Sequence, residues 1–295
     1  MHWIIDALGT EFFLRALTGG ALVAVICGVV GTWVVIRGMA FLGEAVGHGM
    51  LPGVALATVL GLPPMLGGAV SAALMSALIG ALQRRGRLSY DTSIGLLFVA
   101  MLAVGIIIVS HSGSFATDAT ALLFGDVLAI TGADLAALAI AAAVALAIAA
   151  AGHRAFIALA FDPRIARTLG YRTGLAAAGL TGLVTLAVVA SAQAVGTLLV
   201  VALLLGPAVA ALPWSSRIPQ RMLLAAGFGI GAVGIGLAVS WLHATAAGAT
   251  IAAAAVGLAA LSHLARAGLT RAAPSAPHTT ARRTTTPATP LESHA

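Results

Sequence analysis

The chain has 295 residues, of which 60% are hydrophobic and 8% are charged, and its formal net charge is +6. Soluble domains carry roughly 25% charged residues, so this composition excludes an ordinary soluble enzyme and indicates a polytopic membrane protein. A single cysteine, Cys27, excludes an internal disulfide framework and a zinc site built from several cysteines.

Long apolar runs follow one another along most of the chain. A transmembrane helix needs about 20 predominantly apolar residues. The first run is too long for the core of a signal peptide and no small-residue cleavage pattern follows it, so we expect it to be a span. We therefore predict an all-α membrane protein with about nine transmembrane helices, at about 12–36, 41–60, 65–82, 92–110, 134–152, 175–190, 193–212, 222–242 and 246–264.

The positions of the arginines indicate topology. The chain has no lysine, and its arginines follow the first, third, fifth, seventh and ninth runs, with Arg15 as the exception. Because basic residues concentrate in cytoplasmic loops, this pattern predicts an N-outside, C-inside arrangement. The positive charge is thus a topology signal, and no nucleic-acid partner is expected.

The second run contains a carboxylate and an imidazole four residues apart, Glu44 and His48. Residues i and i+4 lie on one face of a helix. A charged side chain inside a membrane usually faces a cavity, a partner or an ion, and both groups are good ligands for divalent transition metals. The pair is our candidate for metal ligands on a transport path. The alternative is that Glu44 only accepts a hydrogen bond that holds His48.

Small residues and a proline surround this pair. Gly43 and Gly47 have a spacing that lets another helix approach closely. Pro52 lacks the N–H that would bond to the carbonyl of His48, so we expect it to kink the helix or to leave that oxygen free. The candidate site is therefore predicted to be closely packed and deformable.

The connection after the fourth run lies on the predicted outer side. It contains His111, Asp118 and Asp126, which either attract cations or dock a delivery protein, or are simply solvated loop residues. The segment 119–130 in this connection is too short to span, so it either re-enters the membrane or lies at its surface.

The longest connection on the predicted inner side contains a short helix. Asp162 is a typical N-cap, Pro163 suits the first helical position and Gly170 suits the C-terminal stop. Arg164 and Arg167 make this helix basic. A helix of this kind either docks on a cytoplasmic partner or lies solvated at the membrane interface.

The composition changes near the end of the chain. Residues 269–295 are rich in Pro, Thr and Arg and almost free of apolar side chains. We expect a disordered cytoplasmic tail there, following a transmembrane domain of residues 1–268.

Five segments together resemble one family. In order along the chain, they are similar to the membrane permease subunits of ABC importers for zinc, manganese and iron, and the likeness extends over about residues 12–265. The segments are residues 37–57, 91–98, 123–128, 161–170 and 193–200.

The resemblance implies partners and roles. It implies a permease homodimer, two cytoplasmic ATPase subunits and an extracytoplasmic metal-binding protein. His48 falls on the His of the family's Gly-Asp-Ala-x-x-His pattern, and Glu44 falls where Asp is usual; that pair is implicated in metal passage. Residues 161–170 fall on the segment that couples to the ATPase. Two positions depart from the family's pattern. Glu44 is one methylene longer than the usual Asp, which leaves the ion position and the selectivity open. Residues 240–249 lack the Asp and Pro that the resemblance leads us to expect there.

The predicted function is that of a permease subunit of an ATP-driven metal importer in the cytoplasmic membrane of a prokaryote. We expect zinc first and manganese next. The Gly-x-x-x-x-Gly-Lys-Ser/Thr motif does not occur, so ATP hydrolysis is expected in a separate subunit, with no cofactor bound permanently. A secondary cation transporter or antiporter using Glu44, or an ABC permease for a metal chelate, are the alternatives. An intramembrane enzyme is disfavoured because neither His-Glu-x-x-His nor Gly-x-Ser-x-Gly occurs.

Overall fold

The computed structural model describes residues 9–84, 89–112, 125 and 127–272. Its helices are α2 (Glu11–Ile36), α3 (Ala40–Gly49), α4 (Leu51–Val59), α5 (Pro64–Arg84), α6 (Tyr90–Ser112), α8 (Gly132–Phe161), α9 (Pro163–Thr168), α10 (Thr173–Val195), α11 (Thr197–Ala211), α12 (Ile218–His243) and α13 (Ala247–Ala272), with short 3₁₀ helices η1 (Val127–Ala129) and η2 (Leu212–Trp214).

The predicted all-α membrane fold is confirmed. In the described residues, nine helical segments are long and apolar enough to cross a membrane, with α3 and α4 together forming the second of them. The sixth and seventh predicted spans are separated at Gly196, whose φ of +79° is readily adopted by glycine. The N-outside, C-inside orientation stays a prediction, and of the predicted tail only the part that continues α13 to Ala272 is described.

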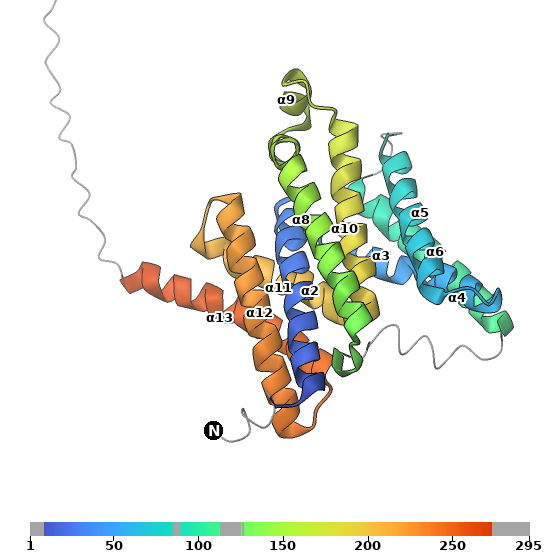
Figure 1. The fold of residues 1–295 in the computed structure, drawn as a ribbon. Coiled ribbons are helices and arrows are strands. Elements are labelled where there is room, and N and C mark those ends of the chain that lie inside the picture. Colours follow the sequence, from blue (N-terminus) through green and yellow to red (C-terminus); the bar gives the residue numbers. More distant parts are fainter. Residues whose placement is uncertain (1–8, 85–88, 113–124, 126, 273–295) are drawn as a thin grey trace, which may run out of the picture.

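Helix α2 is the central element of the bundle (Figure 1). It is surrounded by α8, α10, α11 and α12, and most of its length from Gly19 to Val34 is buried. The approach of α11 is especially close, because a Cβ at Gly31 would overlap the carbonyl oxygen of Leu204. At the other contact, the buried Trp33 packs edge-to-face on His153 and Phe156 of α8, with ring centroids 5.8 and 5.6 Å away.

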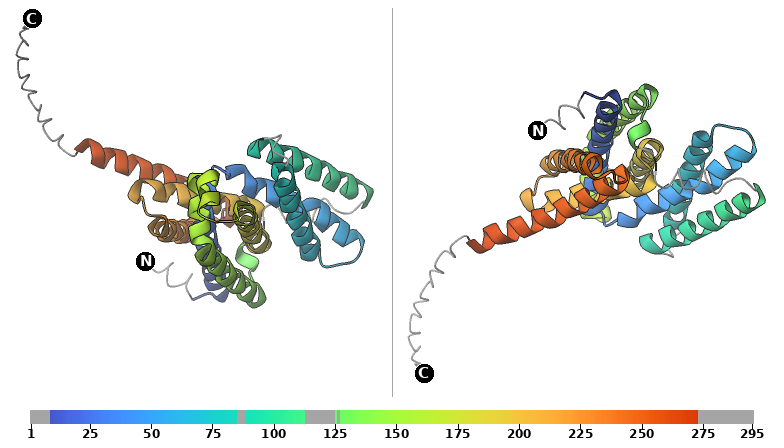
Figure 2. Two further views of the ribbon diagram at one scale, coloured as in Figure 1. Left: turned by 90° about the horizontal axis from the view of Figure 1, so that it is seen from above. Right: turned by 90° about the horizontal axis from the view of Figure 1, so that it is seen from below.

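Helices α3 to α6 form a group on one side of the bundle, and α13 extends away on the opposite side (Figure 2). Helix α10 contacts both α2 and the α3–α6 group. One link is a hydrogen bond between the hydroxyl oxygens of Ser76 on α5 and Thr185 on α10, at 2.5 Å. The second span is therefore attached to the bundle mainly through α10 and α11.

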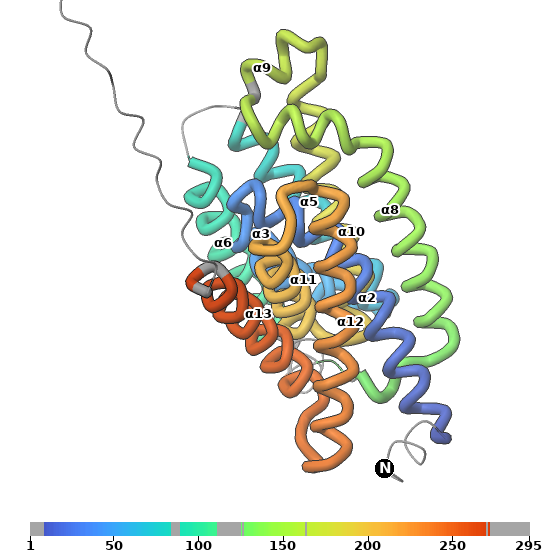
Figure 3. The backbone as a smooth tube through the Cα atoms, turned by 90° about the vertical axis from the view of Figure 1, so that its left-hand side faces the viewer, coloured from blue at the N-terminus to red at the C-terminus, as the bar shows by residue number. Residues whose placement is uncertain are grey.

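One end of the bundle carries the α2–α3 turn with Arg37, the short helix α9 and the α11–α12 connection with Arg217. We call it the arginine-rich end. Figure 3 shows α9 projecting there beyond the ends of α8 and α10, while α13 runs diagonally past α11 and α12. This is the end that the arginine pattern predicts to be cytoplasmic.

Candidate metal site

The second span is interrupted in the middle. Helix α3 ends at Gly49, Met50 separates the two helices, and α4 begins at Leu51. The N–H of Met50 donates to the carbonyl of Gly47 over 3.4 Å, the short-range pattern of a closing turn. Pro52 has no N–H to donate back toward α3. The hydroxyl of Ser71 on α5 instead donates to the carbonyl of Gly49 at 2.7 Å.

Glu44 and His48 lie on one face of α3, just before this interruption. The Nε2 atom of His48 is 2.8 Å from Oε1 of Glu44, and the two side chains are 19% and 34% exposed. The other ring nitrogen, Nδ1, is buried and has no hydrogen-bond partner among the described residues. The imidazole ring packs edge-to-face on Phe98 of α6, with ring centroids 5.4 Å apart. The imidazole is therefore oriented on one side by Phe98 and on the other by the carboxylate.

This arrangement can hold a divalent cation between the two side chains. Ligand atoms about 2.0–2.2 Å from a metal, at about 90° to one another, lie about 3 Å apart. The 2.8 Å between Nε2 and Oε1 is close to that separation, so a metal could replace the shared proton with a small movement. Within the described residues, however, no group of three or more His, Cys, Asp or Glu side chains gathers in one place. One chain thus offers two side-chain ligands.

The glycines flanking the pair lie against neighbouring helices. A Cβ at Gly43 would lie 2.8 Å from Cδ2 of Leu204, and one at Gly47 would lie 3.2 Å from Cβ of Thr197, both on α11. Beyond the interruption, Gly53 and Gly67 place the backbones of α4 and α5 in direct contact, because a Cβ on either would overlap the carbonyl oxygen of the other. The α3–α4 span is thus tightly packed on both halves.

Helix α9 lies at the arginine-rich end. The Asp162 carboxylate accepts a hydrogen bond from the N–H of Arg164 at 2.6 Å, Pro163 occupies the first turn, and Gly170 follows the helix with φ +81°. Phe161, Ile165 and Leu169 are 83%, 56% and 64% exposed. Ile165 lies in α9, Phe161 is the last residue of α8 and Leu169 directly follows α9; we call these three exposed side chains the α9 apolar face. Arg164 and Arg167 are exposed beside it.

The candidates on the predicted outer side are only partly described. Asp118 and Asp126 lie outside the described residues, as does the side chain of His111, whose backbone belongs to α6. In the segment 119–130, the described helix η1 packs on α2, and Val127 is 2% exposed.

Sequence reasoning missed the residues that support the pair from other helices. Phe98, Ser71 and Thr197 come from α6, α5 and α11, far from His48 along the chain. Ser71 and Thr197 are polar residues in apolar spans, which only weakly indicates that they support a site. Phe98 is one apolar residue among many in its run, and this composition does not indicate its contact with His48.

Comparison with known proteins places this architecture in a family. The sequence profile of the ABC 3 transport family matches residues 9–266. The manganese transport system membrane protein MntC of Halalkalibacterium halodurans is 34% identical over 241 residues, which is 82% of each chain. The chain belongs to the ABC 3 transport family. It is a permease of a metal ABC importer and a multi-pass protein of the cytoplasmic membrane.

Other relatives of this ABC 3 permease agree with the assignment. The chelated iron transport system membrane protein YfeD of Yersinia pestis is 31% identical over 240 residues, covering 81% of this chain and 80% of that protein. A solved structure of PsaBC from Streptococcus pneumoniae in complex with Fab has a TM-score of 0.77 and 30% identity, covering 88% of this chain and 94% of the other. The resemblance seen in the sequence is therefore confirmed.

Proposed function

We propose that this permease passes a divalent transition metal across the membrane through Glu44 and His48. The observation that supports this is the contact between their ligand atoms at 2.8 Å, on a face of α3 that stays partly exposed. A carboxylate in a span is costly, about 2.5–3.5 kcal/mol for Asp on insertion scales, so the presence of Glu44 there points to a role with an ion. The interruption at Met50 separates α3, which carries the pair and packs on α11, from α4, which packs on α5.

The proposal also concerns which metal is transported. Imidazole with carboxylate led us to expect zinc before manganese, whereas the relative from Halalkalibacterium halodurans is named for manganese and the one from Yersinia pestis for chelated iron. We therefore put manganese first and keep zinc as the competing cargo. The experiment below follows the free metals and chelated iron separately, so it also tests the alternative of a metal-chelate permease.

The permease is proposed to work as a homodimer. One chain supplies two side-chain ligands, and Glu44 and His48 are both partly exposed. A two-fold related copy would add the same two, which makes a mixed set of two carboxylates and two imidazoles. A transport site has to release its ion, so a set divided between two separable copies suits the task.

The α9 apolar face is proposed to dock on a cytoplasmic ATPase subunit. Three exposed apolar side chains on and next to a short capped helix, together with the exposed Arg164 and Arg167, offer a contact surface. ATP would be used there by the partner. An extracytoplasmic metal-binding protein would deliver the ion at the opposite end. A secondary transporter would need neither partner.

The test is metal uptake in cells that lack this permease and receive either wild type or His48→Ala. Manganese, zinc and free or chelated iron are followed in parallel at matched protein levels in the membrane. We expect His48→Ala to lose uptake of one free divalent metal. His243→Ala is the control, because His243 is an exposed imidazole that also contacts its own helix, 3.2 Å from the carbonyl of Val239. Full uptake by His48→Ala would show that Glu44 and His48 serve helix packing and not metal passage.

A further inference from the structure

One helix packs along both halves of the interrupted second span. Helix α6 contacts α3, α4 and α5. Before the interruption, Phe98 of α6 packs on the imidazole of His48, with ring centroids 5.4 Å apart and ring planes at 70°. After it, a Cβ at Gly105 would lie 3.2 Å from the backbone nitrogen of Pro52. The helix that places Phe98 beside the pair is therefore also packed directly on α4.

Phe98 belongs to the packed face of α6. Four residues spaced by four, three and four positions share this face of the helix: Ile94, Phe98, Met101 and Gly105. Ile94 is 2% exposed and Gly105 is buried, while the two residues between them are partly buried. On the opposite side of the helix, Val99 is 62% exposed. The ring of Phe98 is thus part of the wall around the pair and does not face the lipid.

This wall determines what an ion meets at the pair. Nε2 of His48 lies 2.8 Å from Oε1 of Glu44, and Nδ1 is buried without a hydrogen-bond partner among the described residues. An ion that reaches the pair therefore meets one ring nitrogen and one carboxylate of this chain. Beside them lies the ring of Phe98, an apolar surface that cannot replace the hydrogen bonds of water held by the ion.

Divalent cations differ in how they tolerate such a wall. Mg²⁺ requires near-ideal octahedral oxygen ligands and dehydrates reluctantly, so it usually keeps several waters when it binds to a protein. First-row transition metals bind mixed sets of imidazole nitrogen and carboxylate oxygen. Waters pressed against an aromatic ring lose hydrogen bonds, which costs free energy. The Phe98 ring therefore penalises Mg²⁺ more than it penalises a transition metal.

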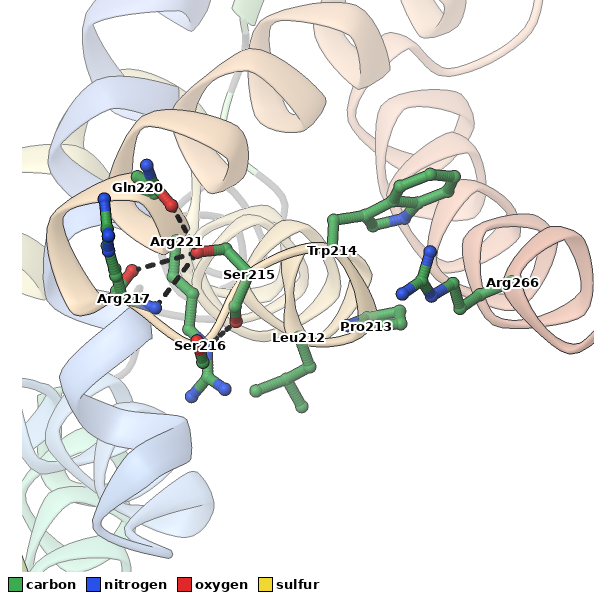
Figure 4. Close-up of a pocket in the computed structure, with 9 residues that line it drawn as sticks. All are labelled: Leu212, Pro213, Trp214, Ser215, Ser216, Arg217, Gln220, Arg221 and Arg266. Atoms are coloured by element: carbon green, nitrogen blue, oxygen red, sulfur yellow. Dashed lines mark hydrogen bonds between the residues drawn. The ribbon is translucent and has the colours of Figure 1, made fainter. Parts of the chain in front are cut away.

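The pocket at the arginine-rich end has the opposite character. Its volume is about 470 Å³, and serine, glutamine and arginine side chains line it between η2, the start of α12 and α13 (Figure 4). The hydroxyl of Ser215 lies 2.8 Å from Oε1 of Gln220 there. Such walls suit water, but arginines repel a divalent cation. Selection among divalent metals is therefore expected at the pair and not in this pocket.

We propose that Phe98 is a specificity-determining residue of the metal path, which keeps hydrated Mg²⁺ from binding at Glu44 and His48. This inference rests on the function proposed above and defines its cargo further, as a divalent transition metal that exchanges water for nitrogen and oxygen ligands. Phe98 acts through its contact with His48 and through its apolar surface, and it does not bind the ion itself.

The test is Mn²⁺ binding by the full chain, purified in detergent, with Mg²⁺ added in increasing excess. Bound Mn²⁺ is measured from the loss of the electron paramagnetic resonance signal of the free aqueous ion. We expect wild type to keep its Mn²⁺ in a large excess of Mg²⁺. In Phe98→Ser, the freed space and the hydroxyl can hold ion-bound water, so Mg²⁺ should displace Mn²⁺ at a concentration at least about tenfold lower. Phe98→Leu keeps the surface apolar and should resist Mg²⁺ as wild type does.

The matched control is Leu97→Ser. Leu97 is also partly buried against the core, but it points about 100° away from Phe98 around the helix. This variant should resist Mg²⁺ as wild type does. An equal change in both serine variants would show a general effect of a polar residue on α6 and overturn the proposal, as would wild-type resistance of Phe98→Ser. If Phe98→Ser does not fold, Phe98→Thr places a hydroxyl at the same position and is held to the same two outcomes.

The variant His48→Ala separates this inference from the proposed function. If His48→Ala binds Mn²⁺ as tightly as wild type, the pair does not hold the ion and the proposed function is wrong. If His48→Ala loses Mn²⁺ while Phe98→Ser still resists Mg²⁺, the pair holds the ion and only the role given to Phe98 is wrong.

Discussion

Arg37 donates a hydrogen bond from Nη1 to the carbonyl oxygen of Leu159 at 2.5 Å. Arg37 lies between α2 and α3, and Leu159 lies in the last turn of α8, just before α9. The turn after Arg37 is itself stiff: Gly38 has φ +65°, and the N–H of Met39 donates to the carbonyl of Val34 at 2.9 Å. The last turn of α8, just before the element proposed to contact the ATPase, is therefore joined by one hydrogen bond to the turn that leads into the helix carrying Glu44 and His48.

Replacing Arg37 by Met should lower metal uptake about tenfold while the ATPase subunit still co-purifies, because a hydrogen bond from a charged donor contributes about 1.5–3 kcal/mol. The guanidinium of Arg37 is partly removed from water, and this burial lowers its pKa. Arg154→Met, on the exposed side of α8, is the control. Unchanged uptake by Arg37→Met would show that the bond carries no coupling.

Replacing Glu44 by Gln should lower uptake more than about tenfold, since an amide oxygen is a weaker metal ligand than a carboxylate. Glu44→Asp should keep most of the activity, because the carboxylate remains and a metal can bridge the longer gap to His48. Uptake of manganese and zinc by both variants, at equal membrane levels, checks this. Equal activity of the Gln and Asp variants would contradict a role in metal binding.

Replacing Ser71 by Ala should destabilise the fold by about 1–3 kcal/mol, the cost of a buried acceptor left without a donor. Gly49 ends α3, so its carbonyl depends on the Ser71 hydroxyl. Ser93→Ala is the control: Ser93 is also buried, but the carbonyl of Ser89 to which it donates accepts the N–H of Ser93 as well. Thermal unfolding in detergent should separate the two variants.

Replacing Gly67 by Ala should destabilise the packing of α4 on α5 by about 1–3 kcal/mol, as overpacked contacts do. The added Cβ would overlap the carbonyl of Gly53. Gly80→Ala on the same helix is the control, because its Cβ would meet nothing within 4 Å, and alanine there should be neutral or stabilising by up to ~1 kcal/mol. Similar melting temperatures for both variants would exclude the close approach.

Replacing Ile165 by Glu should weaken co-purification of the ATPase subunit at least about tenfold, because a charge would enter a desolvated apolar contact. The melting temperature of the permease alone should stay the same, since Ile165 is 56% exposed. Arg172→Glu, in the same connection but outside the α9 apolar face, should have a smaller effect. If both variants lose the partner equally, net charge and not the apolar face governs the contact.

Sequence reasoning succeeded where the physical cause is local. Apolar runs of spanning length predicted the nine candidate spans found in the described residues, and the spacing of Glu44 and His48 predicted the face they share. The cap at Asp162 and the stop at Gly170 follow from side-chain and backbone chemistry within a few residues.

Long-range contacts were out of reach of the sequence. Which helices become neighbours decides three of the contacts described above, and the apolar runs are too similar in composition to show which of them pack together. These contacts are Ser71 with Gly49, Phe98 with His48 and Arg37 with Leu159. The helix interruption at Met50, by contrast, lies within the turn before Pro52, which has no N–H to donate to the carbonyl of His48.

The interrupted second span also has a consequence for how the chain enters the membrane. Among the nine candidate spans in the described part of the chain it is the least apolar, and it is divided into two pieces of 10 and 9 residues. Neither piece reaches across a bilayer, since each covers only about 15 Å at 1.5 Å per residue. During synthesis this segment should insert poorly by itself and depend on the strongly apolar α2 before it and α5 after it. Of α2, the α3–α4 span and α5, the span that carries the candidate ligands should then be the last to insert stably into the bilayer.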